Sequence, residues 1–413
     1  MLLEYSCSNY KSIKEKIAFS MIAGSDDTFA DKQIVAGNQN VLRTAIMYGP
    51  NGSGKSNVIN SLTFMKELVS NSISYQPGQG IFRAPHKLSS ISEPSEFKIQ
   101  FIRNGLRYAY GFILRDYSVI EEYLYYFPNG RKVQIFERDN NTIIPGSKYK
   151  SAFDVSITVL KDNRLFLSCA ANYSNIPEIE QAFRFFSEDI VIYTDNGLNN
   201  WIEYSIELMQ KDSSIKDRFV KLLQGFDTGI TDVNVKMEQV DVSPDELPAE
   251  MPSVIKPLFV GKQKRMEARV IYDKFSTDLL SEESVGVKKL FEMICPILDI
   301  LSKGKVLICD EFERDLHEIL AYEIIKMFRN AEGDQTAQLI FSTHDTGLLS
   351  KDLFRRDQIW FTQLREDRST DLYSLTEIKN VRKSENLEKG YISGKYGAIP
   401  VLNMDFVNTM AEM

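Results

Sequence analysis

Residues Gly49–Ser56 read GPNGSGKS, which has the glycine, lysine and serine spacing of a phosphate-binding loop, G-x-x-x-x-G-K-[ST]. The apolar run VLRTAIMY precedes this segment and predicts a buried strand, and the apolar spacing after it predicts a helix. Glycines let the backbone curl so that its N–H groups face a phosphate, and the helix start adds the positive end of its dipole. This context on both sides favours a nucleotide-phosphate site over a chance glycine-rich turn.

The residues of this loop have distinct expected roles. Lys55 would reach the β and γ phosphates of a nucleotide, and the Ser56 hydroxyl would be a ligand of Mg²⁺. The other residues expected to surround the phosphates are Gly49, Asn51, Gly52, Ser53, Gly54 and Asn57. The expected cofactors are therefore ATP and Mg²⁺.

A second apolar run, VLICDE (Val306–Glu311), ends in two carboxylates. Asp310 would hold Mg²⁺ through water, and Glu311 would orient or deprotonate the attacking water. By itself the run is also typical of a strand that simply ends in acidic residues. The presence of a phosphate loop in the same chain favours the catalytic interpretation. The two motifs lie about 260 residues apart, which is typical of an ABC-type head with insertions and far more than a compact GTPase or AAA+ module needs.

The segment LIFSTHD (Leu339–Asp345) predicts another buried strand, which follows the helix after Glu311 and ends beside His344. A histidine at this place can sense the γ-phosphate of ATP, and we expect His344 to do so. The alternative is a structural histidine on a loop. Lys55, Glu311 and His344 are therefore the expected catalytic residues.

The sequence ESVGVKK (Glu283–Lys289) lies upstream of the carboxylate motif and predicts a small-residue turn followed by a helix. It departs from the LSGGQ form but fits a looser E-S-x-G-x-[KR]-[KR] pattern. Ser284 and Gly286, with the helix N-terminus behind them, could act in trans on the γ-phosphate held by another subunit. The alternative is an ordinary helix with Ser284 as its N-cap.

Composition and charge exclude several classes of protein. The chain has 413 residues, of which 43% are hydrophobic and 26% are charged, which is ordinary globular composition. Its net charge is −8, so the surface is not coated for non-specific DNA binding. No apolar run approaches the ~20 residues of a membrane span, and the first residues carry Glu and Lys, unlike a signal peptide. Four scattered cysteines predict reduced thiols, so we expect a cytoplasmic protein without membrane contact.

The apolar periodicity predicts an α/β protein in three parts. Residues 1–160 would form an N-terminal lobe with the phosphate loop and an antiparallel meander, 161–275 a helical insertion lobe, and 276–413 a C-terminal lobe with the remaining motifs. Residues 240–265 predict an excursion that carries the basic cluster GKQKR, for which a solvated face is favoured over contact with nucleic acid. The expected fold is a mixed sheet around the phosphate loop, packed with an antiparallel β-lobe.

The set of motifs resembles the ABC-type ATPases of the SMC/RecF/OLD-like group. SNYKSI (Ser8–Ile13) is similar to an N-F-[KR]-S segment of those proteins, which implies that Lys11 or Ser12 approaches the nucleotide. Two C-terminal segments tighten the likeness. RRDQIWFT (Arg355–Thr362) and EKGYISGKYGAIP (Glu388–Pro400) resemble prokaryotic defence ATPases of the OLD-like and RloA/AbiL type, the ATPases of the PARIS anti-phage system among them.

This resemblance implies a P-loop ATPase head that works as a switch in phage defence. It implies a homo-oligomer, a dimer or a larger ring, because Ser284 and Gly286 would complete the site of a neighbouring subunit, with Asp315 near the interface. It further implies a separately encoded effector, most simply a Toprim-type nuclease, and leaves room for a phage-encoded trigger. About 100 residues follow Glu311, and they offer no acidic cluster of the Toprim kind.

Two other functions stay open at this point. One is a RecF-like repair ATPase whose DNA binding is gated by ATP, which DNA-stimulated hydrolysis would favour. The other is a scaffold that binds ATP but barely hydrolyses it, against which the intact Glu311 argues.

Overall fold

The structure is a computed structural model that describes residues 1–193, 201–243, 252, 260–314, 316–331, 335–382 and 384–400. The chain divides into two compact units. Unit 1 comprises Met1–Thr194, Lys303–Phe312 and Tyr322–Met413, and unit 2 comprises Asp195–Ser302 and Glu313–Ala321.

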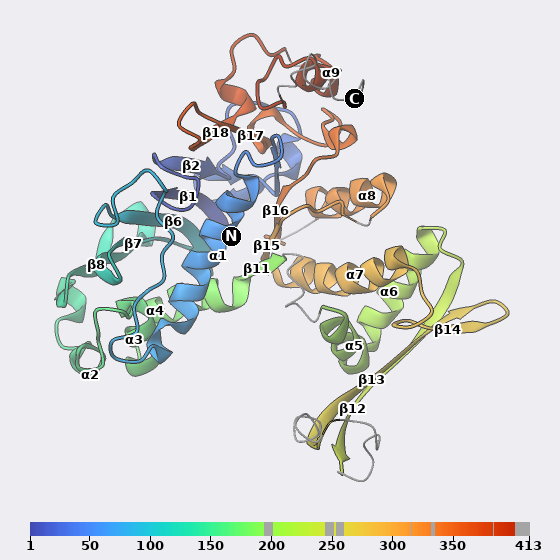
Figure 1. Ribbon diagram of the computed structural model, residues 1–413, viewed down its shortest axis with the longest axis horizontal. Coiled ribbons are helices and arrows are strands. Elements are labelled where there is room, and N and C mark those ends of the chain that lie inside the picture. The colour runs from blue at the N-terminus through green and yellow to red at the C-terminus, as the bar shows by residue number, and fades with distance from the viewer. Residues whose placement is uncertain are drawn as a thin grey trace. The chain divides into compact units, whose positions relative to one another are not determined.

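A six-stranded sheet in unit 1 carries the sequence motifs. Its strand order is β11-β15-β16-β5-β17-β18 (Figure 1). The strands are β11 (Ile190–Tyr193), β15 (Val306–Cys309), β16 (Gln338–Ser342), β5 (Thr44–Tyr48), β17 (Ile359–Leu364) and β18 (Thr370–Ser374). The first five run parallel and β18 is antiparallel to β17. Every residue of β5, β15 and β16 is buried, which explains why these strands read as continuous apolar runs.

Three strands of this sheet, β11, β17 and β18, were not predicted. The sequence predicts helices from about 163 to 224, but Ile190–Tyr193 forms β11 and pairs in parallel with β15. The segment IVIY consists of β-branched and aromatic residues, which favour strands, yet it is only four residues long and directly follows a helical pattern. The central sheet supplies the pairing partner that the local pattern cannot reveal.

The predicted meander forms a seven-stranded antiparallel sheet in unit 1. Its strand order is β10-β9-β8-β7-β6-β1-β2, so the N-terminal hairpin completes the meander. The strands are β1 (Leu2–Ser8), β2 (Ile17–Ser20), β6 (Ser95–Arg103), β7 (Leu106–Arg115), β8 (Ser118–Tyr126), β9 (Val133–Asp139) and β10 (Thr142–Pro145). Buried and half-buried residues alternate along β6, as expected for a strand with one face in a core.

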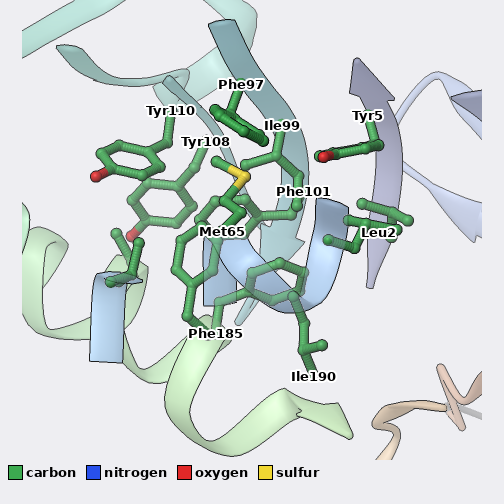
Figure 2. Close-up of a cluster of buried hydrophobic side chains, with 14 of the residues drawn as sticks. Leu2, Tyr5, Met65, Phe97, Ile99, Phe101, Tyr108, Tyr110, Phe185 and Ile190 are labelled. Atoms are coloured by element: carbon green, nitrogen blue, oxygen red, sulfur yellow. The ribbon is translucent and has the colours of Figure 1, made fainter. Parts of the chain in front are cut away.

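The helix that follows the phosphate loop packs in the hydrophobic core against this sheet. Helix α1 (Lys55–Asn71) buries Met65, which Figure 2 shows among aromatic side chains of β6 and β7. Phe101 of β6 stacks on Phe185 with ring centroids 4.0 Å apart, and Tyr108 of β7 stacks on Phe101 at 5.2 Å. Aromatic pairs of this kind stabilise a core beyond the area they bury. The phosphate-loop helix therefore has a rigid support.

A buried ion pair fixes helix α3 (Phe166–Tyr173) to this sheet. The Glu122 carboxylate on β8 accepts hydrogen bonds from the N–H groups of Phe166 (2.5 Å) and Leu167 (2.9 Å), and Arg138 lies 3.4 Å away. Burial raises the pKa of Glu122, against the opposing attraction of Arg138 and the helix N–H groups. The anchored helix α3 belongs to unit 1, which extends to Thr194.

In its described residues, unit 2 contains helices and a three-stranded antiparallel sheet, two strands of which form a long ribbon (Figure 1). The elements are α5 (Trp201–Lys211), α6 (Ser213–Gly225), β12 (Ile230–Val242), β13 (Gly261–Tyr272), β14 (Ser276–Asp278) and α7 (Val285–Lys303). One face of the ribbon carries the buried Val233 and Val270, and the predicted basic cluster lies on β13. The predicted excursion at 240–265 includes the ends of both ribbon strands, and residues 244–251 and 253–259 lie outside the described residues.

The remaining elements of unit 1 are short. They include the hairpin β3 (Ile34–Ala36) and β4 (Gln39–Val41), and the helices α2 (Asp154–Thr158), α4 (Pro177–Arg184) and α9 (Leu387–Ile392). Helix α8 (Glu318–Arg329) begins in unit 2 and ends in unit 1. Among the helices in the described part of the chain, none combines the length and the apolar character needed to cross a membrane.

The buried ion pair gives a stability prediction. The Glu122→Ala variant leaves Arg138 buried without its carboxylate and removes the acceptor of two helix N–H groups. We expect the free energy of unfolding to fall by about 3–5 kcal/mol. The exposed neighbour variant Glu121→Ala should change it by less than about 0.5 kcal/mol. Urea denaturation of both variants checks this, and equal stability of the two would contradict the structural role of Glu122.

Candidate nucleotide site

Three loops meet at one edge of the central sheet. The strands β5, β15 and β16 are parallel, and Ser342 at the end of β16 is level with Met47 of β5. The phosphate loop follows β5, Asp310 and Glu311 follow β15, and His344 follows β16. The carboxyl ends of parallel strands lie at the same edge of a sheet, where such sheets bind ligands. Because β16 is the middle strand, it carries His344 to a place between the carboxylates and the phosphate loop.

The phosphate loop needs glycine at two close approaches. Gly54 has a φ of +109°, and a Cβ there would lie 2.0 Å from Thr370 Oγ1. A Cβ on Gly49 would lie 2.4 Å from the backbone oxygen of Thr362. No side chain fits at such distances, and a positive φ is readily adopted only by glycine. Contacts with β17 and β18 therefore explain the first and second glycines of the motif.

Hydroxyl groups brace the loop from three segments of the chain. Ser53 Oγ lies 2.6 Å from Thr362 Oγ1, and Thr370 Oγ1 donates to Ser53 O at 3.0 Å. Thr370 Oγ1 also lies 2.7 Å from Ser12 Oγ, which accepts a bond of 2.7 Å from Asn57 Nδ2. The sequence assigns no role to Thr370 or to Thr362, although Thr362 ends the segment Arg355–Thr362 that carries part of the resemblance. Their role depends on the pairing of β17 and β18 beside β5.

The N-terminal segment that the resemblance singled out lies against this brace. Ser12 contacts the phosphate-loop helix through Asn57. Lys11 has a φ of +49°, its N–H donates to Ala84 O at 2.6 Å, and its Nζ lies 5.7 Å from the centre of the Tyr10 ring. The approach of Lys11 to a nucleotide remains a prediction.

The start of α1 fits a phosphate group. Lys55 is 5% exposed, and its Nζ donates to Gly49 O at 2.6 Å and to Pro50 O at 3.4 Å. No side chain caps the N-terminus of this 17-residue helix, so the N–H groups of its first turn suit phosphate oxygens as acceptors. Ser56 is exposed at the same end, as are Asn51 and Gly52 in the loop.

The Asp310 carboxylate and the backbone N–H of Glu311 both bond to Ser342, a residue that the sequence analysis did not single out. Ser342 Oγ donates to Asp310 Oδ1 at 2.5 Å and accepts from the Glu311 N–H at 2.9 Å. Ser342 is fully buried, whereas Asp310 and Glu311 are half-buried at the sheet edge. Glu311 has a φ of +51°, which costs a residue other than glycine of order 1–3 kcal/mol. Ser342 lies within the segment LIFSTHD, which the sequence analysis quotes. Its role could not be predicted, because that role depends on β16 lying beside β15.

His344 is exposed at the start of a well-fixed loop. The following residue, Asp345, caps the short 3₁₀ turn η8 (Thr346–Leu348) with its side chain. Tyr48, the last residue of β5, donates its hydroxyl to Asp345 O at 2.9 Å. The loop of residues 343–348, called here the histidine loop, is thus connected to β5, the strand that precedes the phosphate loop.

The signature-like segment belongs to unit 2. Ser284 Oγ accepts a hydrogen bond of 3.3 Å from Val287 N at the start of α7, so Ser284 caps this helix, as the alternative reading predicts. A Cβ on Gly286 would meet no atom within 4 Å, so its surroundings are open. The action of Ser284 and Gly286 in trans remains a prediction. Asp315 lies outside the described residues.

A cavity of about 1400 Å³ lies at the other edge of the central sheet and is distinct from this site. Arg43, which precedes β5, lines it and donates to two backbone carbonyl oxygens at 2.7 and 3.0 Å. Arg103 pairs with Asp189 at 3.1 Å, and Arg107 lies 3.9 Å from the centre of the Phe127 ring. These arginines already have partners within the chain.

The sequence motifs and their geometry agree with a known protein family. Residues 45–174 and 273–350 match the family described as "AAA domain, putative AbiEii toxin, Type IV TA system". These residues make up half of the chain and include the phosphate loop, both carboxylates and His344. The chain belongs to this family. No curated protein sequence matches it.

Solved structures similar to this AAA-domain protein include head domains of SMC proteins. An SMC head bound to the C-winged helix domain of ScpA is 14% identical, with 90% of this chain and 97% of that chain covered and a TM-score of 0.44. The SMC head domain from Thermotoga maritima is 15% identical, with coverage of 90% and 98% and a TM-score of 0.41. An SMC head derived from Pyrococcus furiosus is 11% identical, with coverage of 96% and 98% and a TM-score of 0.40.

The predicted fold class is confirmed. This member of the AAA-domain family is an α/β protein with a phosphate loop, a mixed sheet and an antiparallel β-lobe. The helical lobe is inserted between β11 and β15 as the main part of unit 2.

The donor set suits a metal ion that is shared with a nucleotide. Within the described residues, no group of three or more His, Cys, Asp or Glu could hold a metal ion. Mg²⁺ in nucleotide sites usually takes one or two protein oxygens, phosphate oxygens and water. The exposed Ser56 hydroxyl and the Asp310 carboxylate are the oxygens that the AAA-domain site offers.

The glycine contacts give a binding prediction. In Gly54→Ala the new methyl group would collide with Thr370, whereas Gly52→Ala, with a φ of +78° and no atom within 4 Å, tests the backbone strain alone. We expect Gly54→Ala to weaken ATP binding at least about tenfold more than Gly52→Ala does. Titration with a fluorescent ATP analogue measures this. Equal losses in the two variants would show that the contact with Thr370 is unimportant.

The Ser342 contacts give a second prediction. Ser342→Ala removes the donor to Asp310 and leaves the Glu311 N–H without its acceptor. We expect the gain in ATP affinity on adding Mg²⁺ to shrink about tenfold, since Asp310 is no longer oriented. ATP affinity without Mg²⁺ should not change. Ser342→Thr, which keeps the hydroxyl, should retain most of the Mg²⁺ effect. Calorimetric titration with and without Mg²⁺ distinguishes these results, and an undiminished Mg²⁺ effect in Ser342→Ala would refute the role.

Proposed function

We propose that this protein is a Mg²⁺-dependent ATPase that acts as an oligomeric switch in a bacterial anti-phage defence system and controls a separately encoded effector. The observation that carries the proposal is the meeting of the phosphate loop, the Asp310–Glu311 pair and His344 at one edge of one sheet. The family description, which names an AbiEii toxin and a toxin–antitoxin system, supports the defence context.

Each residue of the site has a task in ATP hydrolysis. Lys55 and the N–H groups at the start of α1 hold the phosphates, and Ser56 and Asp310 supply oxygen ligands for Mg²⁺. Bound Mg²⁺ would neutralise charge on the phosphates. Glu311 orients the attacking water and accepts its proton, and His344 contacts the γ-phosphate. The hydrogen bonds of Ser342 orient the Asp310 carboxylate and fix the backbone of Glu311.

The switch acts between subunits in this proposal. Ser284 and Gly286 at the start of α7 complete the nucleotide site of a neighbouring copy, so the protein forms a dimer or a larger ring. Val285 is 63% exposed and Leu280 is 46% exposed, so apolar side chains near the start of α7 are open to solvent. An ATP molecule held between two copies would make assembly depend on the nucleotide.

The biological role extends the resemblance to OLD-like and RloA/AbiL-type defence ATPases. The assembly would hold a separately encoded Toprim-type nuclease and release or activate it when a phage-encoded trigger appears. This places the protein in the cytoplasm of the host cell. The C-terminal segment Glu388–Pro400 is the most selective part of that resemblance.

The charge pattern favours this role over a RecF-like DNA clamp. Lys264 in the basic cluster of β13 pairs with Glu203 and with Glu207, and Arg265 pairs with Glu267 at 3.3 Å. Cations with carboxylate partners release few counterions on contact with DNA and so contribute little to binding. The proposal therefore gives nucleic acid no essential part in hydrolysis.

The decisive experiment measures particle size by light scattering together with ATP hydrolysis. Wild type should be a dimer or larger and should hydrolyse ATP without DNA. Glu311→Gln should bind ATP with similar affinity and lose hydrolysis by at least about 100-fold, since the water is no longer activated. Glu366→Gln, which removes an exposed carboxylate elsewhere in unit 1, is the matched control and should hydrolyse ATP normally.

Two results would overturn the proposal. A monomer that hydrolyses ATP only when DNA is added would support the RecF-like clamp instead. A wild type that binds ATP and shows no hydrolysis above Glu311→Gln would support a scaffold.

A further inference from the structure

The C-terminal segment that carries part of the sequence resemblance supplies no residue to the nucleotide site described above. Residues 385–400, called here the C-terminal clamp, begin with Glu385, contain α9 and end at Pro400. All of them are described and all belong to unit 1. Their contacts point to the histidine loop.

The clamp is a closed module built on two tyrosines. Tyr391 is 8% exposed and Tyr396 is 2% exposed. The Tyr391 hydroxyl donates to Ala398 O at 2.9 Å, and the Tyr396 hydroxyl donates to Glu385 Oε1 at 2.9 Å. A Cβ on Gly390 would lie 2.3 Å from the Tyr396 hydroxyl, which explains the glycine beside Tyr391. The module therefore has a defined shape of its own.

The two tyrosines attach the clamp to the strands that support the phosphate loop. The Tyr391 ring lies 5.4 Å from the ring of Tyr48 on β5 and 5.6 Å from the ring of Phe361 on β17. The hydroxyl of Tyr373 on β18 donates to Tyr396 O at 2.8 Å. The clamp is thus fixed to three neighbouring strands of the central sheet.

From this base the clamp reaches the histidine loop by two routes. Thr346 Oγ1, two residues after His344, donates to Glu388 Oε1 on α9 at 3.2 Å. Tyr48, which packs against the ring of Tyr391, donates its hydroxyl to Asp345 O. Both residues that follow His344 are therefore held by the clamp, one directly and one through Tyr48.

We propose that the C-terminal clamp positions His344 for ATP hydrolysis by fixing the loop of residues 343–348 through Glu388 and Tyr391. Glu388 and Tyr391 are positioning residues, because neither touches the reacting atoms in this scheme. The inference rests on the proposed ATPase function and extends it, since it gives the most selective segment of the sequence a task at the nucleotide site. A sensor that is misplaced by about 1 Å can lose a large part of its effect on the reaction rate.

The test uses variants of the hydrogen bond between Thr346 and Glu388. Glu388→Ala and Thr346→Val each remove it, and we expect each to lower kcat about tenfold with ATP affinity within about twofold of wild type. Glu388→Gln keeps an acceptor oxygen and should restore most of the rate. The double variant Glu388→Ala/Thr346→Val should be no slower than either single variant, because both remove the same contact. Lys389→Ala, on the exposed side of the same helix, should behave as wild type.

Hydrogen exchange provides a readout that does not need hydrolysis. The amides of residues 343–348 should exchange faster in Glu388→Ala and in Thr346→Val than in wild type or Lys389→Ala, while the melting temperature stays the same. Unchanged kcat and unchanged exchange in Glu388→Ala would overturn the clamp. A matching loss of kcat, ATP affinity and melting temperature would also overturn it, since that pattern indicates general destabilisation. A wild type without hydrolysis refutes the proposed function and with it the catalytic role of the clamp, whereas the exchange data report separately on the loop contact.

Discussion

The hydroxyl of Ser342 joins the Asp310 carboxylate and the backbone N–H of Glu311 to the neighbouring strand, and much of the arrangement depends on this contact. It donates to Asp310 and accepts from the N–H of Glu311, so one buried atom sets the orientation of the first residue and the backbone turn of the second. The contact exists because β16 lies between β15 and β5. The same strand order brings His344 next to the phosphate loop. The position of β16 therefore places the carboxylates, the histidine and the phosphate loop together, although they are far apart in the chain.

The site has firm support on its other side. Helix α1 carries Lys55 and Ser56 at one end and buries Met65 among the aromatic residues of the antiparallel sheet. Hydroxyl contacts from Ser12, Thr362 and Thr370 hold the loop before the helix. A catalytic site gains from such rigidity, because binding groups that are already in place lose little entropy when the ligand arrives.

Much of this could be predicted from sequence, and the omissions have two causes. The strands β5, β15 and β16 are fully buried and parallel, so their apolar runs are unmistakable, and the loop motif lies directly between a strand and a helix. The strand β11 was missed because four residues carry too little periodicity. Ser342, Thr362 and Thr370 were missed because their roles arise from strand order, and a lone serine or threonine reveals nothing about its neighbour across a sheet. Ser284 was read as either a trans contact or a helix cap, and only the cap can be seen within one chain.

The left-handed backbone of Glu311 has a consequence for how this protein can change over evolutionary time. At a φ of +51° the residues that lose least are Gly, Asn and Asp, whereas β-branched residues are strongly disfavoured. A lineage that abandons hydrolysis but keeps the fold would therefore be expected to replace this glutamate with one of a few small residues. The backbone conformation that orients Glu311 therefore also limits which residues can replace it.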